Sequence, residues 1–479
     1  MNNPSPPAPE PTPEPTLSAA PKTSTKASPT ALPTALPTAL PATPPATSPA
    51  SAPVQPHITW TDPQGQAHQA DWRSLAGHAP PKRIEVVDDT IDADTAYRLA
   101  CEGTGLLWAG DFQNARLLLQ ALGRRMDKRE DRRLEKSGQR PKRASGSAKA
   151  AKASGPLSAR AEAAMVLMPR APVQAESAAP SATALQATAL QAFHAHRKSQ
   201  AERARILGRL LLPFEADHAV PLRRAPDLRQ AGLQAHGAVG QHYVASLREL
   251  LGLVGAYEWR KKGVPVEALD AKIHPWHGVF SPVRGEYIQL VHQAPLPAAA
   301  KAGVAFDIGT GTGVLAAVLA RRQLNVVATD NQPQALACAR DNLKRLKLDK
   351  RVQVQEADMF PPGRAALVVC NPPWVPAQPS SPLEAAVYDP DSRMLKAYLA
   401  GLSQHLAPGG EGWLLLSDLA EHLGLRSRAE LLGWIRAGGL KVLGRLDAKA
   451  EHAKAADAGD TLHQARAAET TTLWRLGPA

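Results

Sequence analysis

The chain has 479 residues, a formal net charge of +12 and 44 prolines. Sixteen of these prolines fall within the first 55 residues, which contain four charged residues and no aromatic ones. Such a segment cannot bury enough apolar surface to fold, so a uniformly folded chain is excluded and we expect residues 1–56 to be a disordered Pro/Ala/Thr-rich tail. The three cysteines lie far apart without a Cys-x-x-Cys pair, which disfavours a disulfide scaffold and a thiolate zinc site.

The sequence lacks the patterns of targeting and membrane-spanning segments. The sequence has no run of 18 apolar residues, and its first residues lack a basic segment followed by an apolar one. Membrane spans and secretory signals show those patterns. We therefore expect a cytoplasmic protein without a membrane partner, and the sequence favours no particular oligomeric state.

Most of the positive charge lies in one tract. Residues 124–152 contain twelve Lys or Arg against four Asp or Glu. A basic tract of this kind either lies along nucleic-acid phosphates or forms a solvated helical extension and linker. We assign residues 124–190 as a basic Ala/Lys/Arg-rich linker, and the charge suggests a nucleic acid or a ribosome as partner without requiring one.

The regions on either side of this tract have different patterns. Residues 57–123 predict a small α/β accessory region, because Gly105–Asp111 has the pattern of a short buried strand that leads into a helix over 114–122. Residues 191–297 predict a mainly helical accessory region, with one helical stretch from 193 to 214 and a second from 243 to 259.

Residues 298–479 alternate between strand and helix patterns. Strands are expected at 304–307, 326–330, 352–357, 366–370 and 412–416, and a closing strand pair at 440–446 and 470–476. Helices are expected at 314–322, 333–346, 394–406 and 427–437. This alternation predicts an α/β fold with a Rossmann-like, doubly wound sheet, covered by helices on both faces.

A glycine-rich turn follows the first of these strands. Asp307 precedes Gly309, Gly311 and Gly313, and the glycines allow the backbone to approach a nucleotide-like ligand closely. The dinucleotide fingerprint Gly-x-Gly-x-x-Gly has its third glycine one residue later, so a pyrophosphate loop of the NAD type is disfavoured. The position of Asp307 fits a ligand with a cationic amine better than a diphosphate.

Acidic residues also follow the next two strands. Asp330 ends the second strand, where a carboxylate can accept both hydroxyls of a ribose. The alternative is a helix N-cap, a role for which Asn331 is equally suited. After the third strand, Asp358 can accept a hydrogen bond from an adenine amine while Met359 and Phe360 flank the ring.

The fourth strand ends in Asn371-Pro372-Pro373-Trp374. A Pro-Pro turn would be the plain structural interpretation. An amide or ring amine, however, is a poor nucleophile because its lone pair is delocalised. If the Asn371 side-chain oxygen and the Pro372 carbonyl accept its two hydrogens, they fix the nitrogen and favour its pyramidal form. Trp374 can stack on a planar acceptor or face a positive charge, so we predict all four residues to be catalytic.

In this order, the motifs resemble those of class I S-adenosylmethionine-dependent methyltransferases of the branch that methylates planar nitrogen, over residues 304–476. The resemblance implies S-adenosyl-L-methionine as cofactor, without a metal. It also implies that the cofactor is bound across the ends of the first three strands and that the acceptor nitrogen lies at the fourth. The residues assigned to cofactor binding are Asp307, Gly309, Gly311, Gly313, Asp330, Asn331, Asp358, Met359 and Asn371.

Two subfamilies of that branch are compatible with the motifs. Release-factor glutamine methyltransferases usually carry Tyr after the two prolines and ribosomal RNA guanine-amine methyltransferases usually carry Phe, whereas this chain carries Trp374. The segment Phe280–Glu286 is similar in position, though not in residues, to a substrate-side segment of the glutamine enzymes.

The sequence thus predicts an S-adenosylmethionine-dependent N-methyltransferase. The basic tract and the extra N-terminal region favour an rRNA base amine as acceptor, which makes nucleic acid the expected partner. One alternative is a glutamine side chain of a translation-associated protein, as in the release-factor enzymes. A second alternative is a non-catalytic, cofactor-binding RNA-binding or ribosome assembly factor.

Overall fold

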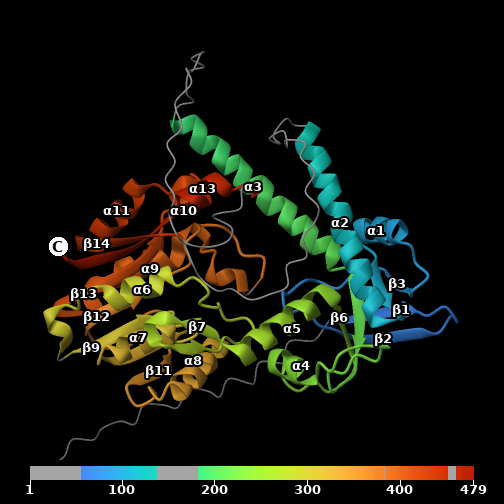
Figure 1. The fold of residues 1–479 in the computed structure, drawn as a ribbon, viewed down its shortest axis with the longest axis horizontal. Coiled ribbons are helices and arrows are strands. Elements are labelled where there is room, and N and C mark those ends of the chain that lie inside the picture. The colour runs from blue at the N-terminus through green and yellow to red at the C-terminus, as the bar shows by residue number, and fades with distance from the viewer. Residues whose placement is uncertain (1–55, 137–181, 302, 382, 451–459) are drawn as a thin grey trace, which may run out of the picture. The chain divides into compact units, whose positions relative to one another are not determined.

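The computed structural model describes residues 56–136, 182–301, 303–381, 383–450 and 460–479. All of them belong to one contact unit, Gln55–Ala479. The expected tail, apart from residue 56, and most of the expected linker lie outside the described residues. The described part of the chain forms a six-stranded and a seven-stranded sheet together with a short hairpin of β7 (Val264–Val266) and β8 (Ala271–Ile273) (Figure 1).

The six-stranded sheet organises the accessory domain and has the order β1-β2-β6-β5-β4-β3. Its strands are β1 (His57–Thr61), β2 (Ala67–Trp72), β3 (Ile84–Val87), β4 (Gly105–Trp108), β5 (Leu210–Phe214) and β6 (Tyr243–Ser246). Strands β5 and β6 take up the end of the first and the start of the second helical stretch expected there, at 193–214 and 243–259, so the first of those helices ends earlier and the second begins later than expected. The two accessory regions share one sheet.

The physical reason for this difference is the burial of β5 on both faces. Leu211 packs into one apolar cluster, whereas Leu210 and Leu212 pack into the cluster on the opposite face. A strand that is buried on both faces is a continuous apolar run, and such a run cannot be told from a buried helix by periodicity.

Five helices accompany this sheet in the described residues: α1 (Ala93–Glu102), α2 (Phe112–Lys136), α3 (Ala182–Leu207), α4 (Arg229–His236) and α5 (Leu247–Lys262). Helix α2 continues past residue 123, where the linker was expected to begin. Part of its charged second half is paired, because Asp127 and Arg129 form ion pairs with Arg203 and Glu202 of α3. The tract is therefore helical as far as Lys136.

The seven-stranded sheet has the order β11-β10-β9-β12-β13-β15-β14. The first five are parallel, and β15 runs antiparallel to both of its neighbours. The bounds are β9 (Val304–Ile308), β10 (Asn325–Asp330), β11 (Val352–Glu356), β12 (Ala365–Cys370), β13 (Leu406–Ser417), β14 (Leu440–Lys449) and β15 (Thr470–Pro478). The predicted Rossmann-like fold and its closing strand pair are confirmed.

Helices cover both faces of this sheet. They are α6 (Glu286–Gln293), α7 (Val314–Arg321), α8 (Pro333–Arg345), α9 (Arg393–His405), α10 (Leu419–His422), α11 (Arg428–Ala437) and α13 (His463–Ala468). Successive residues of β9 point to opposite cores, because Ala305 packs with α6 and α7 while Phe306 packs with α9 and α11. Within the described ranges, no helix is long and apolar enough to cross a membrane.

The shared accessory sheet generates a stability prediction. Leu211 is fully buried on β5, so Leu211→Ala should lower the free energy of unfolding by about 2–5 kcal/mol, through lost burial and the cavity left behind. Leu117 is 59% exposed on α2, and Leu117→Ala should change it by no more than about 0.5 kcal/mol. Urea unfolding of both variants measures the difference, and equal losses would contradict the burial of β5.

Candidate active site

A cavity of about 1650 Å³ lies where the parallel strands of the seven-stranded sheet end. Strand β9 has β10 on one side and β12 on the other, so the loops after β9 and β12 diverge and open a crevice between them. Eleven predicted site residues line the cavity: Asp307, Gly309, Gly311, Asp330, Asn331, Asp358, Met359, Asn371, Pro372, Pro373 and Trp374. The fold thus brings together segments that are up to 67 residues apart in sequence.

The glycine-rich loop contains two kinds of glycine. Gly311 has a φ of +55° and faces open space, because a Cβ built there would have no atom within 4 Å. Gly313 has a φ of +79°, and its Cβ would lie 3.2 Å from Cα of Ala339 on α8. Gly311 therefore leaves room for a ligand, whereas Gly313 permits α7 and α8 to pack closely. Gly313 was predicted to bind the cofactor, but it does not line the cavity.

Asp307 is buried at the end of β9 with 1% of its surface exposed. Its Oδ2 accepts hydrogen bonds from Thr310 Oγ1 at 2.6 Å and from the backbone N–H of Ala316 at 3.0 Å. Burial raises the pKa of this carboxyl to about 6, and these hydrogen bonds oppose the shift. A cation that entered the cavity would stabilise the charged form.

Asp330 links the glycine-rich loop to the start of α8. Its Oδ2 accepts from the N–H of Gly311 at 3.0 Å, and its Oδ1 accepts from the N–H of Gln332 at 2.9 Å. The second bond is a local turn, because the N-cap of α8 is Gln332 and no N-cap side chain caps this helix, so the capping alternative that the sequence left open is not seen. Each carboxylate oxygen keeps a further lone pair, so these two hydrogen bonds do not exclude a ligand hydroxyl. Burial raises the pKa of Asp330 as well.

The third acidic position lies beside β11. Asn331 donates from Nδ2 to Asp358 Oδ1 at 3.4 Å, which holds the two side chains together at the cavity rim. The Met359 carbonyl accepts from Thr329 Oγ1 at 2.7 Å. Phe360 is not part of the lining, so the expectation that it flanks a bound ring is wrong. Its ring stacks at 4.2 Å on His405 of α9 instead.

The Asn371-Pro372-Pro373-Trp374 segment leaves β12 at the same end of the sheet. The indole Nε1–H of Trp374 donates to Asn371 Oδ1 at 2.9 Å. Because an indole nitrogen is only a donor, the amide must turn its oxygen toward it. The hydrogen bond therefore fixes the orientation of the amide group and leaves one lone pair of Oδ1 unused.

Two residues that sequence reasoning missed hold the Trp374 ring. The guanidinium carbon of Arg284 lies 4.8 Å from the centre of the ring, and Tyr287 meets it edge-on at 6.4 Å. Arg284 also pairs with Glu286 and Glu469, at 2.5 and 2.9 Å. The sequence pointed to Arg284 only through its position, because Arg284 lies in the segment Phe280–Glu286.

Residues 375–381 and 383–389 form a further part of the cavity boundary, which we call the wall segment. The N–H of Val375 donates to the carbonyl of Val387 at 3.2 Å, and the N–H of Asp389 donates to the carbonyl of Val375 at 2.9 Å. The Asp389 carboxylate accepts from the N–H groups of Met394 and Leu395 and so caps α9. Seven residues of the wall segment line the cavity: Val375, Pro379, Ala385, Ala386, Val387, Tyr388 and Asp389.

Comparison with known proteins gives consistent matches. The family model of the methyltransferase small domain matches residues 270–423. The release factor glutamine methyltransferase of Cereibacter sphaeroides is 36% identical over 110 residues, which cover 22% of this chain and 36% of that protein. The same enzyme of Xylella fastidiosa is 31% identical over 219 residues, covering 41% and 76%. The tRNA1(Val) (adenine(37)-N6)-methyltransferase of Vibrio parahaemolyticus is 38% identical over 73 residues, covering 14% and 30%.

The fold and these matches define a class I S-adenosylmethionine-dependent N-methyltransferase. Within that class, the chain belongs to the family of the release factor glutamine methyltransferases, since it covers 76% of the Xylella fastidiosa enzyme. It spans only 36 to 42% of the length of three other relatives with that name. The accessory sheet lies outside the residues that the family model matches.

The buried Asp307 generates a prediction of pH dependence. A cationic amine binds the ionised carboxylate, so protonation of Asp307 competes with the ligand. The affinity for S-adenosylhomocysteine, which carries such an amine, should be constant above pH 7 and fall up to tenfold per unit below about pH 6. Calorimetry across pH 5–8 measures this.

Two substitutions control the pH experiment. Asp307→Asn keeps the hydrogen-bond acceptor without the charge, so it should weaken binding at pH 7.5 and flatten the profile. Asp349 is exposed after α8, and Asp349→Asn should retain the wild-type profile. A wild-type profile for Asp307→Asn would contradict the contact with the amine.

Proposed function

We propose that this enzyme methylates the side-chain amide nitrogen of a glutamine in a translation protein, as the names of its relatives suggest for them. The observation that carries the proposal is the position of the Asn371 amide oxygen, fixed by Trp374, on the same cavity as the open face of Gly311. An rRNA base amine was the acceptor favoured from sequence, and the family membership favours the glutamine alternative.

The residues around the cavity fit S-adenosylmethionine. Asp307 would bind its cationic amine, the open face of Gly311 would leave room for it, and Asp330 would accept the ribose hydroxyls. Asn331, Asp358 and Met359 would surround the adenine. When bound, this cofactor supplies an electrophilic methyl group on a positively charged sulfur.

The chain itself prepares the acceptor nitrogen. Asn371 Oδ1 and the Pro372 carbonyl would accept the two N–H hydrogens of the glutamine amide, which fixes the nitrogen and favours its pyramidal form. Attack of the nitrogen lone pair on the methyl carbon would break the carbon–sulfur bond, whose electron pair would go to sulfur, and the methylated nitrogen would lose one proton to water. Prolines 372 and 373 keep the two acceptors rigid, because their rings restrict the backbone.

The described part of the basic tract also weakens the case for RNA. Arg125 forms an ion pair with Asp94 at 2.7 Å, and Arg129 forms one with Glu202 at 3.6 Å. Basic side chains that are paired within the protein are less available to phosphates, and phosphate contacts supply most of the affinity of non-specific RNA binding. The charge that suggested a nucleic acid is thus partly neutralised by the fold.

Methyl transfer to defined acceptors tests the proposal. The full chain is incubated with tritiated S-adenosylmethionine and either an unmethylated bacterial release factor or total rRNA. We expect label in the protein, resistant to nuclease and located on a glutamine by mass spectrometry. Label in the RNA would overturn the glutamine assignment, and cofactor binding without label in either would overturn the proposed activity on these acceptors.

Removal of the Asn371 side-chain oxygen generates a second prediction for this site. Asn371→Ala should lower kcat by about 10²–10³ through the loss of one positioned group, with the Kd for S-adenosylhomocysteine changed less than about twofold. Asp330→Ala should instead affect cofactor binding more than kcat. It should raise the Kd for S-adenosylhomocysteine by about 10–100-fold, which corresponds to the free energy of one lost charge-assisted hydrogen bond. Single-turnover kinetics and calorimetry separate the two, and a wild-type rate for Asn371→Ala would remove its assigned role.

The indole hydrogen bond generates a third prediction. Trp374→Phe keeps an aromatic ring over Arg284 and removes the N–H that orients the Asn371 amide. We expect kcat to fall by about tenfold, the usual net value of one hydrogen bond, without a change in cofactor affinity. If cofactor affinity fell by the same factor as kcat, the change of ring, rather than the loss of the N–H, would account for the effect.

A further inference from the structure

We propose that Arg197, on helix α3 of the accessory domain, is a positioning residue for the acceptor side of the cavity. It would act by holding the wall segment in place. The inference concerns the acceptor and therefore rests on the proposed function. It is carried by the contacts of Arg197, which does not line the cavity itself.

The Arg197 guanidinium holds the wall segment at three points. Nη2 donates to the carbonyl of Gln378 at 2.7 Å. Nη1 and Nη2 both donate to Oε2 of Glu384, at 3.1 and 3.2 Å. The guanidinium carbon also lies 4.2 Å from the ring centre of Tyr388. These contacts reach from residue 378 to residue 388, a span of eleven residues. One side chain outside the cavity therefore holds both parts of the wall segment.

The Glu384 carboxylate is held in its charged form at this contact. Burial alone would raise its pKa, but hydrogen bonds from Ser380 and the charge of Arg197 outweigh burial and lower the pKa below the usual value. Ser380 donates to Glu384 Oε2 from both its N–H and its hydroxyl, at 2.8 Å each. The ion pair thus connects Arg197 to a wall segment that is already cross-linked internally.

An apolar contact accompanies the ionic one on the same face of α3. Phe193 is one helical turn before Arg197 and is 3% exposed. It packs with Val375 in a cluster that also contains Leu423 and Leu462, with Trp374 and Tyr388 partly buried against it. Helix α3 therefore contacts both the start and the end of the wall segment.

The other end of α3 is anchored in the accessory domain. Leu207 belongs to the core of that domain, Ile206 is fully buried, and Ser199 donates to Glu130 of α2. The second half of α3 packs against α2 (Figure 1). The accessory domain is in this way mechanically connected to the cavity boundary beside Trp374.

The position of the wall segment decides which kinetic constant should respond. It adjoins Trp374 and α9, whereas the predicted cofactor residues, apart from Asn371, lie at the ends of β9, β10 and β11. The contacts within it are mostly local turns, apart from the backbone bonds between Val375 and residues 387 and 389. Loss of Arg197 should therefore loosen the acceptor side and leave the cofactor side unchanged.

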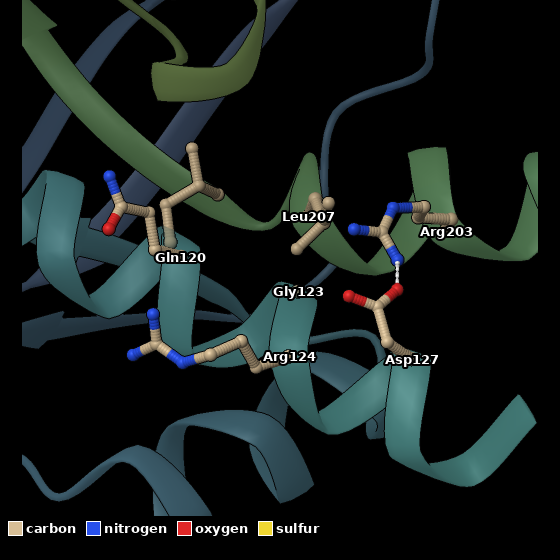
Figure 2. A pocket seen from close by; sticks show the side chains of 7 residues that line it. Gln120, Gly123, Arg124, Asp127, Arg203 and Leu207 are labelled. Atoms are coloured by element: carbon tan, nitrogen blue, oxygen red, sulfur yellow. Dashed lines mark hydrogen bonds and ion pairs between the residues drawn. The ribbon is translucent and has the colours of Figure 1, made fainter. Parts of the chain in front are cut away.

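Three variants test this proposal. Arg197→Ala removes all three contacts, and Arg197→Lys keeps the charge but cannot reproduce the planar fork. Arg203→Ala is the matched control, since Arg203 lies on the same helix and pairs with Asp127 instead of the wall segment (Figure 2). Each protein is examined by hydrogen exchange of residues 376–381 and 383–388, by calorimetry with S-adenosylhomocysteine, and by methyl-transfer kinetics on an unmethylated release factor.

For Arg197→Ala we expect exchange in the wall segment to accelerate about tenfold and KM for the release factor to rise about tenfold, as for a lost charged hydrogen bond. The kcat should stay within about threefold and the cofactor Kd within about twofold. Arg197→Lys should be intermediate, and Arg203→Ala should match the wild type in all four quantities.

Unchanged exchange in Arg197→Ala would overturn the proposal, as would a rise in cofactor Kd equal to the rise in KM. If Arg197→Ala fails to fold, Glu384→Gln removes the same ion pair from the wall side and should give the same pattern. If the wild-type enzyme does not methylate the release factor, the proposed function fails, and the exchange measurement alone then decides whether Arg197 holds the wall segment.

Discussion

The strand order of the C-terminal sheet is the constraint on which the site depends. Because β9 lies between β10 and β12, the loops that leave β9 and β12 cannot pack against each other, and a crevice opens at the ends of the strands. The eleven predicted residues that line the cavity all lie at or just after the end of one of these parallel strands. The indole of Trp374 adds a constraint of its own, because it determines which atom of the Asn371 amide is available to an acceptor.

The sequence predicts the parts of this site that have a local pattern. The acidic and glycine residues after β9 and β10 follow strands with clear apolar runs, and the Asn-Pro-Pro-Trp segment is recognisable without tertiary information. Other features depend on long-range packing. Gly313 is adjacent to Ala339 of α8, and Phe360 stacks on His405 of α9, and neither contact follows from spacing along the chain.

In the accessory domain, too, contacts between distant parts of the chain do not follow from the sequence. Strands β4 and β5 pair although about 100 residues separate them, and β2 pairs with β6 although about 170 residues separate them. Neither pairing follows from the composition of its own segment, so the two accessory regions looked independent. The contacts of Arg197 with Gln378 and Glu384 join positions that are more than 180 residues apart, and the sequence offers no signal that connects them.

The raised pKa of Asp307 links ligand binding to stability. Its pKa of about 6 in the folded protein exceeds the ordinary value of 3.8, so the folded state binds this proton more tightly than the unfolded state does. At pH values above about 6 the buried charge costs on the order of 3 kcal/mol of folding free energy, and below about 4 the cost disappears. A cationic ligand beside the carboxylate offsets that cost where the group is ionised. The cavity without ligand is thus the less stable state at neutral pH, and part of the binding energy comes from relief of this buried charge.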